Sequence, residues 1–286
     1  MTVRRVGLVP HPYRAAAVEL AKHAADRLAE NGVEVRVPGP DADSAGLAHL
    51  AVDLEHFAQD LDVVISLGGD GTMLRAVDLA YEAGVAVLGV NVGQLGYLTE
   101  IEPDDFDAAL DRLLAGDYEV AERMVLSIDV ASEGSARGRW FGLNEAVLEK
   151  VHTGRLVRLE VDVNGAPFTS YAADGVIVAT PTGSTAYSFS ARGPIVSPRL
   201  RCLLLTPVSP HMLFDRSLVL AAEETLRFTV CDDRSVVLTL DGRELGDLAA
   251  RDTVSCTGGP LPARIVTLGP RDFHQILKAK FGLADR

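Results

Sequence analysis

The sequence predicts an α/β domain with a mainly parallel sheet, followed by a β-rich domain. Up to residue 118, short apolar runs alternate with helical patterns, which is typical of a parallel sheet covered by helices. After Tyr118, strand-like segments follow one another with turns between them and few helical runs. A helical pattern returns over Phe273–Phe281. We therefore expect domains over 1–118 and 119–268, and a C-terminal helix within 269–286 that returns to the first domain.

Composition limits the class of protein. A chain of 286 residues with 48% hydrophobic residues is long enough for two domains with substantial cores. The net charge of −13 argues against a nucleic-acid partner but is compatible with phosphorylated small molecules. No apolar stretch approaches the ~20 residues that span a bilayer, and the start lacks the apolar core of a signal peptide. The widely spaced Cys202, Cys231 and Cys256 indicate reduced thiols, so we expect a cytoplasmic protein without a membrane partner.

The first domain alternates strand and helix patterns in chain order. The apolar run Val63–Leu67 is short, rich in β-branched residues and free of charge, as expected for a strand buried on both faces. We expect strands over Val3–Pro10, Val33–Val37, Val63–Leu67 and Val85–Val90, and helices over Ala15–Ala29, within Asp41–Gln59, over Met73–Ala83 and over Asp104–Ala115.

The strand Val63–Leu67 ends abruptly in the glycine-rich segment Gly68–Thr72, which reads GGDGT. Glycines lack a Cβ atom, so their backbone N–H groups can approach an anion closely. The next helix adds a dipole that favours phosphate at its N-terminus, and we expect Thr72 to cap that helix. The Asp70 carboxylate is unfavourable beside a phosphate unless it holds Mg²⁺ or accepts a proton. The alternative is a tight strand-to-helix turn in which Asp70 only caps the helix.

A second glycine-punctuated loop, Asn91–Leu98, follows the next strand. In sheets of this kind, ligands bind at the carboxyl ends of the strands. We therefore expect this loop and the GGDGT loop to line one crevice.

The second domain consists mainly of strand-like segments. We expect them over Val120–Ala131, Arg139–Lys150, Leu156–Val163, Pro167–Ala172, Val176–Thr180, Thr225–Val230 and Val236–Leu240. The pairs Asn164-Gly165 and Asp241-Gly242 are typical hairpin turns.

A loop rich in hydroxyl groups, Thr180–Ala186, follows one of these strands directly. Its hydroxyls and free amides are suited to holding a ribose or a phosphate, and Tyr187 adds an aromatic face. The alternative is an ordinary Thr/Ser/Pro-rich surface loop. The pair Asn144-Glu145 closes another apolar stretch and by itself indicates no more than a strand end.

Four of these segments together resemble the NAD kinase family. They are GGDGT (Gly68–Thr72), NVGQLGYL (Asn91–Leu98), LNE (Leu143–Glu145) and DGVIVATPTGSTAYSFSA (Asp174–Ala191), in the family's order. PVSPH (Pro207–His211) and Asp241-Gly242 extend the resemblance. GGDGT also occurs in diacylglycerol and sphingosine kinases and in the wider phosphofructokinase-like group, whereas the other segments are more specific. The resemblance implies a phosphofructokinase-like α/β domain and a β-sandwich-like C-terminal domain.

The resemblance also implies the reaction. A phosphoryl group passes from ATP or polyphosphate to the 2′-hydroxyl of the adenosine ribose of NAD, giving NADP, with Mg²⁺ as cofactor. Asp70 is the implied catalytic carboxylate, and Mg²⁺ is held by phosphates, with Asp70 as a candidate ligand. The implied substrate-binding residues are Gly68, Gly69, Gly71, Thr72, Arg75, Asn144, Glu145, Arg155, Ala172, Asp174, Thr185, Ala186, Tyr187, Ser188, Ser190, Ser209 and Arg243. Family members form homodimers or homotetramers, and we expect the same here.

Three positions distinguish this chain within the resemblance. Arg192 stands where the family usually has a second glycine, and Arg243 where it commonly has glutamine. Ala172 is small and neutral where some NAD kinases carry a basic side chain, so we expect NADH to be phosphorylated alongside NAD. A lipid kinase and a non-catalytic dinucleotide-binding regulator remain alternatives. The first predicts an acyl-binding cleft or membrane-binding surface, and the second predicts loss of Asp70, which is present.

Overall fold

The computed structural model describes residues 3–93, 96–132, 135–152, 154–231, 235–269 and 272–283. The chain forms two compact units, Met1–Glu122 with Ala263–Arg286, and Arg123–Pro262. These boundaries differ from the expected 118 and 268. The reason is that two segments, Glu119–Arg123 and Ala263–Thr267, are strands of the sheet of the first unit.

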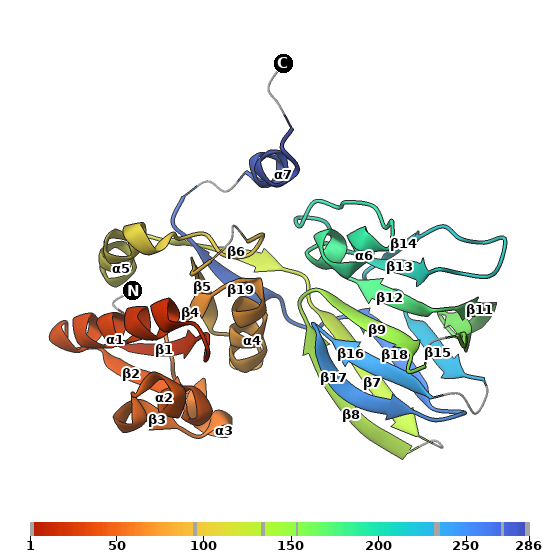
Figure 1. Ribbon diagram of the computed structural model, residues 1–286, viewed down its shortest axis with the longest axis horizontal. Helices are drawn as coiled ribbons and strands as arrows, with labels where there is room; N and C mark the ends of the chain where they lie inside the picture. The colour runs from red at the N-terminus through yellow and green to blue at the C-terminus, as the bar shows by residue number, and fades with distance from the viewer. Residues whose placement is uncertain are drawn as a thin grey trace. The chain divides into compact units, whose positions relative to one another are not determined.

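The first unit is built on a seven-stranded sheet in the described part of the chain, with strand order β3-β2-β1-β4-β5-β19-β6 (Figure 1). The strands are β1 (Arg5–Pro10), β2 (Glu34–Pro38), β3 (Ala51–Val52), β4 (Val63–Gly68), β5 (Ala86–Asn91), β19 (Ala263–Thr267) and β6 (Glu119–Arg123). The helices are α1 (Ala15–Glu30), α2 (Gly39–Ala45), α3 (Leu54–Phe57), α4 (Asp70–Ala80), α5 (Phe106–Ala115) and α7 (Phe273–Phe281), with 3-10 turns at Ala48–Leu50 and Pro103–Asp105. The pairs from β3 to β19 are parallel, which confirms the predicted α/β class.

The central strands are buried along their whole length, as their composition predicts. Every residue of β4 and of β5 is buried. Alternate side chains of β4, such as Ile65, lie in one core with α1 and α5. The other face of the sheet packs against α4, where a Cβ on Gly89 would lie 3.1 Å from the Met73 sulfur. Because helices cover both faces of the sheet, the side chains on both faces of these strands are apolar.

The helix after the GGDGT segment begins earlier than predicted. Helix α4 starts at Asp70, and its N-cap residue is Gly69. The expectation that Thr72 caps this helix is therefore wrong, because Thr72 lies inside the first turn with its side chain buried. A Cβ on Gly68 would lie 2.2 Å from the Thr72 hydroxyl oxygen, so glycine at position 68 makes room for this side chain.

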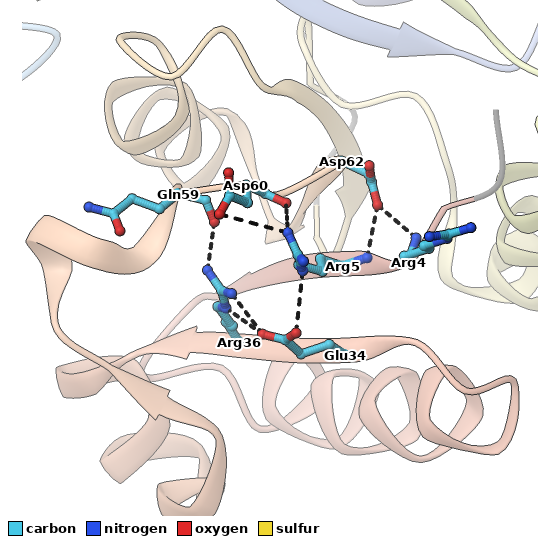
Figure 2. Close-up of polar contacts among 7 residues, drawn as sticks. All are labelled: Arg4, Arg5, Glu34, Arg36, Gln59, Asp60 and Asp62. Atoms are coloured by element: carbon cyan, nitrogen blue, oxygen red, sulfur yellow. Dashed lines mark hydrogen bonds and ion pairs between the residues drawn. The ribbon is translucent and has the colours of Figure 1, made fainter.

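A polar network ties the amino ends of the first strands together (Figure 2). The Asp62 carboxylate accepts from the backbone N–H groups of Arg4 and Arg5, at 2.7 and 2.9 Å. Figure 2 shows both Arg5 and Arg36 directed at Glu34. Arg5 Nε lies 3.4 Å from Glu34 Oε2, and Arg36 Nη2 lies 2.7 Å from Glu34 Oε1. Exposed ion pairs of this kind contribute little energy individually. The network lies at the end of the sheet opposite to the glycine-rich loops, which follow the carboxyl ends of the strands.

The second unit consists of two antiparallel six-stranded sheets in the described residues, with orders β11-β10-β15-β18-β7-β8 and β14-β13-β12-β9-β16-β17. The strands are β7 (Leu126–Ser132), β8 (Ser135–Gly142), β9 (Glu145–Lys150), β10 (Val157–Val163), β11 (Ala166–Ala173), β12 (Gly175–Ala179), β13 (Cys202–Val208), β14 (Leu218–Ala221), β15 (Leu226–Val230), β16 (Val236–Leu240), β17 (Arg243–Leu248) and β18 (Thr253–Gly258). One core contains side chains of both sheets, such as Ile128 of β7 and Leu148 of β9. This arrangement confirms the β-sandwich-like domain.

Local sequence signals predicted this unit only in part. The expected strand Arg139–Lys150 is two strands, because the chain bends at Leu143 and Asn144 and changes sheet. Both predicted hairpin turns are present. Asn164 and Gly165 have φ of 53° and 78°, and Asp241 and Gly242 have φ of 49° and 78°, as type I′ turns require. None of the helices in the described ranges has the length and apolar composition to cross a membrane.

Candidate functional site

Asp70 is bound by the second glycine-rich loop of the first unit. The Tyr97 N–H donates to its Oδ2 at 2.8 Å, and the Leu98 N–H donates to its Oδ1 at 3.0 Å. The loop also starts beside the GGDGT segment, since the Val92 N–H donates to the Gly68 carbonyl at 2.8 Å. The two loops therefore meet as expected, although Gln94 and Leu95 of the second loop lie outside the described residues.

The glycines of these loops have two different roles. A Cβ on Gly96 would lie 2.2 Å from Asp70 Oδ1, so glycine at position 96 is required for the close approach of the carboxylate. A Cβ on Gly69 or Gly71, by contrast, would meet no atom of the described residues within 4 Å. The space beside these two backbone positions is open at the N-terminus of α4, which is the place where a phosphate binds most favourably.

The predicted binding residue Arg75 is held by a buried carboxylate. Its Nη1 lies 2.7 Å from Asp41 Oδ1, and the Asp41 side chain is only 4% exposed. Asp41 Oδ2 is buried with no hydrogen-bond partner among the described residues. Sequence reasoning missed Asp41, although a carboxylate at the start of a helix that follows a strand end was a usable signal.

A further cation reaches the same group of loops from the N-cap position of α1. The Arg14 guanidinium donates to the Val92 carbonyl through Nη1. A Cβ on Gly93 would lie 2.2 Å from this nitrogen, so the loop backbone and the arginine are in close contact. Arg14 was also missed, because its sequence position gives no indication of a contact 78 residues away.

In the second unit, Asn144 and Glu145 form the corner where β8 passes into β9. The Asp241 carboxylate accepts from three successive backbone N–H groups there, those of Leu143, Asn144 and Glu145, at 2.6, 2.8 and 3.0 Å. The Asp241 N–H donates in turn to the Glu145 carbonyl at 2.9 Å. Asp241 thus contributes more than the hairpin turn that the sequence indicates.

The Glu145 side chain is 7% exposed, and its Oε2 has no hydrogen-bond partner among the described residues. Burial raises the pKa of Glu145 to about 8, and the negative charge of Asp241 contributes to this shift. A hydrogen bond from the Tyr187 N–H acts in the opposite direction. A glutamate in this environment binds its proton in neutral solution.

The hydroxyl-rich loop packs on the Asn144 corner. The Thr180 hydroxyl donates to the Leu143 carbonyl at 2.6 Å, and the Thr180 N–H donates to the Asn144 carbonyl at 2.8 Å. A Cβ on Gly183 would lie 2.2 Å from the Asn144 carbonyl oxygen, so only glycine fits this contact. The loop continues into a 3-10 turn (Gly183–Thr185) and the short helix α6 (Tyr187–Ser190).

The predicted binding residues of this loop differ in accessibility. The Ser188 side chain is buried, with its hydroxyl 3.1 Å from the Thr206 hydroxyl, so its hydrogen bond is internal to the protein. Thr185 and Ala186 are half-buried, and Tyr187 and Ser190 are exposed. The structure therefore leaves the Tyr187 ring open to a ligand, while Ser188 serves the packing of the loop.

Asp174 forms an ion pair with Lys150 of the adjacent strand β9. Both side chains are about one-third exposed, at 33% and 27%. Burial raises the pKa of Tyr187, and the charges of Glu149 and Asp174 raise it further. The shared binding of Asp174 and Tyr187 to one ligand stays a prediction.

The remaining predicted residues lie apart from these contacts. Ala172 is half-buried on β11, opposite Arg158 of β10 in the register. Arg155, Ser209 and Arg243 are exposed, and Arg243 is the first residue of β17. Arg243 pairs with Leu240 in the hairpin that carries Asp241.

A metal site made by protein groups alone is not found among the described residues, where no three His, Cys, Asp or Glu side chains gather. Asp70 nevertheless suits a magnesium ion that is held mainly by phosphates. Each of its oxygens accepts one N–H and keeps a further lone pair, and Mg²⁺ commonly binds one or two carboxylates plus substrate phosphates.

Two family models cover most of the chain. The ATP-NAD kinase N-terminal domain matches residues 6–118, and the ATP-NAD kinase C-terminal domain matches residues 143–268.

Curated relatives match almost end to end. The NAD kinase of Heliobacterium modesticaldum is 41% identical over 96% of this chain and 97% of its own length. NAD kinase 2 of Streptomyces avermitilis is 39% identical over 98% of this chain and 95% of its own length.

Solved structures share the fold at lower identity. Yeast NADH kinase complexed with NADH has a TM-score of 0.91 at 23% identity and covers 100% of this chain and 89% of its own. An NAD kinase from Archaeoglobus fulgidus in complex with ATP has a TM-score of 0.72 at 23% identity, over 97% of both chains. The matches to both domains and to full-length relatives confirm the resemblance seen in the motifs, and the chain belongs to the NAD kinase family.

Proposed function

We propose that the protein is an NAD kinase, which transfers the terminal phosphoryl group of ATP to the 2′-hydroxyl of the adenosine ribose of NAD. The observation that carries the proposal is the position of Asp70. Asp70 lies at the N-terminus of α4, beside the open backbone of Gly69 and Gly71. The backbone N–H groups of Tyr97 and Leu98 hold its carboxylate. The relatives in Heliobacterium modesticaldum and Streptomyces avermitilis, which bear the name NAD kinase, support the same activity.

Asp70 acts on the acceptor hydroxyl. A ribose hydroxyl is a poor nucleophile at neutral pH, and a carboxylate within hydrogen-bond reach accepts its proton as the phosphorus–oxygen bond forms. The bonds from the Tyr97 and Leu98 amides fix the carboxylate, so little reorganisation is needed during the reaction.

The N-terminus of α4 binds the phosphates of the donor. The open amides at Gly69 and Gly71 and the helix dipole favour negative charge there. Asp70 and the phosphates together would hold Mg²⁺, which neutralises the charge of the phosphates during transfer. We propose ATP as donor, and inorganic polyphosphate as the alternative donor to be tested.

We assign recognition of the dinucleotide to the second unit. The Asn144 amide, the Glu145 carboxyl, the Tyr187 ring and the Asp174 carboxylate offer hydrogen bonds and an aromatic face of the kind that ribose and base require. We further propose that the protein works in the cytoplasm as a homodimer or homotetramer, which light scattering on the purified protein would check.

The test is direct. The purified protein is incubated with NAD, Mg²⁺ and either ATP or polyphosphate, and NADP is measured with an NADP-specific dehydrogenase. Reactions without Mg²⁺ and reactions with diacylglycerol in place of NAD serve as controls. We expect NADP to form with at least one donor and no phosphorylated lipid. Formation of phosphatidic acid without NADP would replace the proposal with the lipid-kinase alternative.

A further inference from the structure

Asp241 lies in the turn between β16 and β17 and binds a different part of the chain. Its carboxylate accepts the three N–H groups of Leu143, Asn144 and Glu145, almost 100 residues earlier in the chain. A single carboxylate that binds three successive amides fixes the backbone of all three residues. These bonds are charge-assisted, and such bonds are stronger than those between neutral groups.

The backbone of Asp241 is adapted to this position. Its φ of 49° lies in the left-handed region, which aspartate and asparagine adopt more readily than most residues. The following Gly242 has φ of 78°, and the two residues together make the type I′ turn. The turn alone could be made by glycine, asparagine or aspartate at this position. The three hydrogen bonds from the backbone N–H groups require the two oxygens of a carboxylate.

The charge of Asp241 also acts on the Glu145 side chain. Glu145 is buried, and one of its oxygens has no partner among the described residues. If the Glu145 carboxyl were ionised, the negative charge of Asp241 would repel it. Burial is the main cause that raises the pKa of Glu145, and the charge of Asp241 is the second cause.

The elements that pack around Glu145 contribute few titratable groups. Strand β12 pairs with it through Ala179, and neither β12, β16 nor the Gly183–Thr185 turn contains a titratable side chain. Helix α6 contributes Tyr187, whose N–H bond lowers the pKa of Glu145. Arg243, two residues after Asp241, is exposed.

We infer that Asp241 is a positioning residue for NAD binding, which fixes the Asn144–Glu145 corner through its three hydrogen bonds to backbone N–H groups. The inference rests on the proposed function, in which Asn144 and Glu145 contact NAD. When Glu145 loses its proton at high pH, its repulsion from Asp241 loosens the corner, so the affinity for NAD falls.

Three variants separate shape from charge. Asp241→Gly keeps the left-handed turn and removes all three bonds. Asp241→Asn also keeps the turn, but its amide group has one acceptor oxygen and no charge. Asn164→Gly is the matched control, because Asn164 has φ of 53° in the other type I′ turn and its side chain accepts one N–H, that of Thr225, at 2.9 Å.

Calorimetry on the full chain measures the affinity for NAD between pH 6 and pH 9.5. We expect Asp241→Gly to raise Kd for NAD by about tenfold or more, since several bonds to a charged group are lost, and Asp241→Asn by less. Asn164→Gly should leave Kd unchanged. An Asp241→Gly protein that melts like the Asn164→Gly control and binds NAD like the wild type would overturn the positioning role.

A second readout does not depend on NAD. In protein labelled with ¹³C at the glutamate carboxyls, the Glu145 signal should titrate at lower pH in Asp241→Asn than in the wild type, because a repelling charge is gone. An unchanged titration would overturn the role of the Asp241 charge. If the wild type neither binds NAD nor forms NADP, the proposed function is wrong, and this titration still decides whether Asp241 controls Glu145.

Discussion

Arg75 of α4 and Asp41 of α2 form an ion pair in which the arginine is partly exposed and the aspartate is buried. Arg75 Nη1 lies 2.7 Å from Asp41 Oδ1, and the two side chains are 37% and 4% exposed. The second oxygen of Asp41 has no partner in the described structure. The carboxylate therefore depends on the guanidinium, because an unpaired buried charge is strongly unfavourable.

Arg75→Gln should lower the free energy of unfolding by about 1–3 kcal/mol. This loss is smaller than the loss expected when a fully buried ion pair is broken, because the arginine is partly solvated. Urea unfolding followed by circular dichroism measures the change. Arg27→Gln is the control, since Arg27 is 30% exposed on α1 but its partners Asp107 and Asp111 are 54% and 65% exposed. We expect less than about 1 kcal/mol there. Equal losses in the two variants would contradict a special role of Asp41.

Asp70→Asn should abolish nearly all NAD kinase activity, because the charge that accepts the proton is removed. The substitution does not preserve the hydrogen bonds, since both carboxylate oxygens accept backbone N–H groups and an amide has one acceptor oxygen. A loss of about 1–2 kcal/mol of stability should therefore accompany the loss of turnover. Asp78→Asn, at an exposed position of the same helix, is the control for the activity assay. Turnover of Asp70→Asn near the wild-type level would exclude Asp70 as the catalytic group.

Glu145 should make the folded protein less stable as pH rises. Its pKa is about 8 in the folded protein and 4.5 in the reference state, so the folded state binds the extra proton between these values. Stability therefore falls from pH 4.5 to pH 8, by at most about 5 kcal/mol. Glu145→Gln should flatten this part of the stability–pH curve measured by urea unfolding.

Arg192→Gly should stabilise the protein by about 0.5–1 kcal/mol. Arg192 has φ of 67°, a conformation that is unfavourable for residues with a Cβ and free of strain for glycine. Ala191→Gly is the control, because Ala191 has an ordinary φ of −84° and should lose stability on the same change. Thermal unfolding of both variants decides between relief of strain and a general effect of glycine.

Ala172 should allow NADH to be phosphorylated alongside NAD. A small neutral residue discriminates little between the charged and the uncharged nicotinamide ring, so Ala172→Arg should change the ratio of kcat/KM for the two substrates. Arg158 lies directly opposite Ala172, and a second arginine there costs some stability. Ser170→Arg is the control, because it adds the same charge two residues away, opposite Glu160. A ratio that is the same in all three proteins would exclude Ala172 from substrate discrimination.

The sequence by itself determined the features that depend on neighbouring residues. The continuous apolar run of β4 predicted a strand buried on both faces, and Asn164-Gly165 predicted a type I′ turn because few residues adopt its backbone angles. The motif GGDGT predicted that Asp70 is the carboxylate at a phosphate site. These signals are local, so a single segment contains all the information that they need.

Only the tertiary structure decided which distant groups hold the site residues. Asp70 is fixed by amides 27 residues later, Arg75 by a carboxylate 34 residues earlier, and Asn144 by a carboxylate 97 residues later. The same holds for β19, which pairs with β5 of the first sheet. Such contacts depend on how the strands are ordered in the sheets, and strand order is set by burial of the whole core. No local pattern around Asp241 distinguishes a simple turn from a carboxylate that binds three amides.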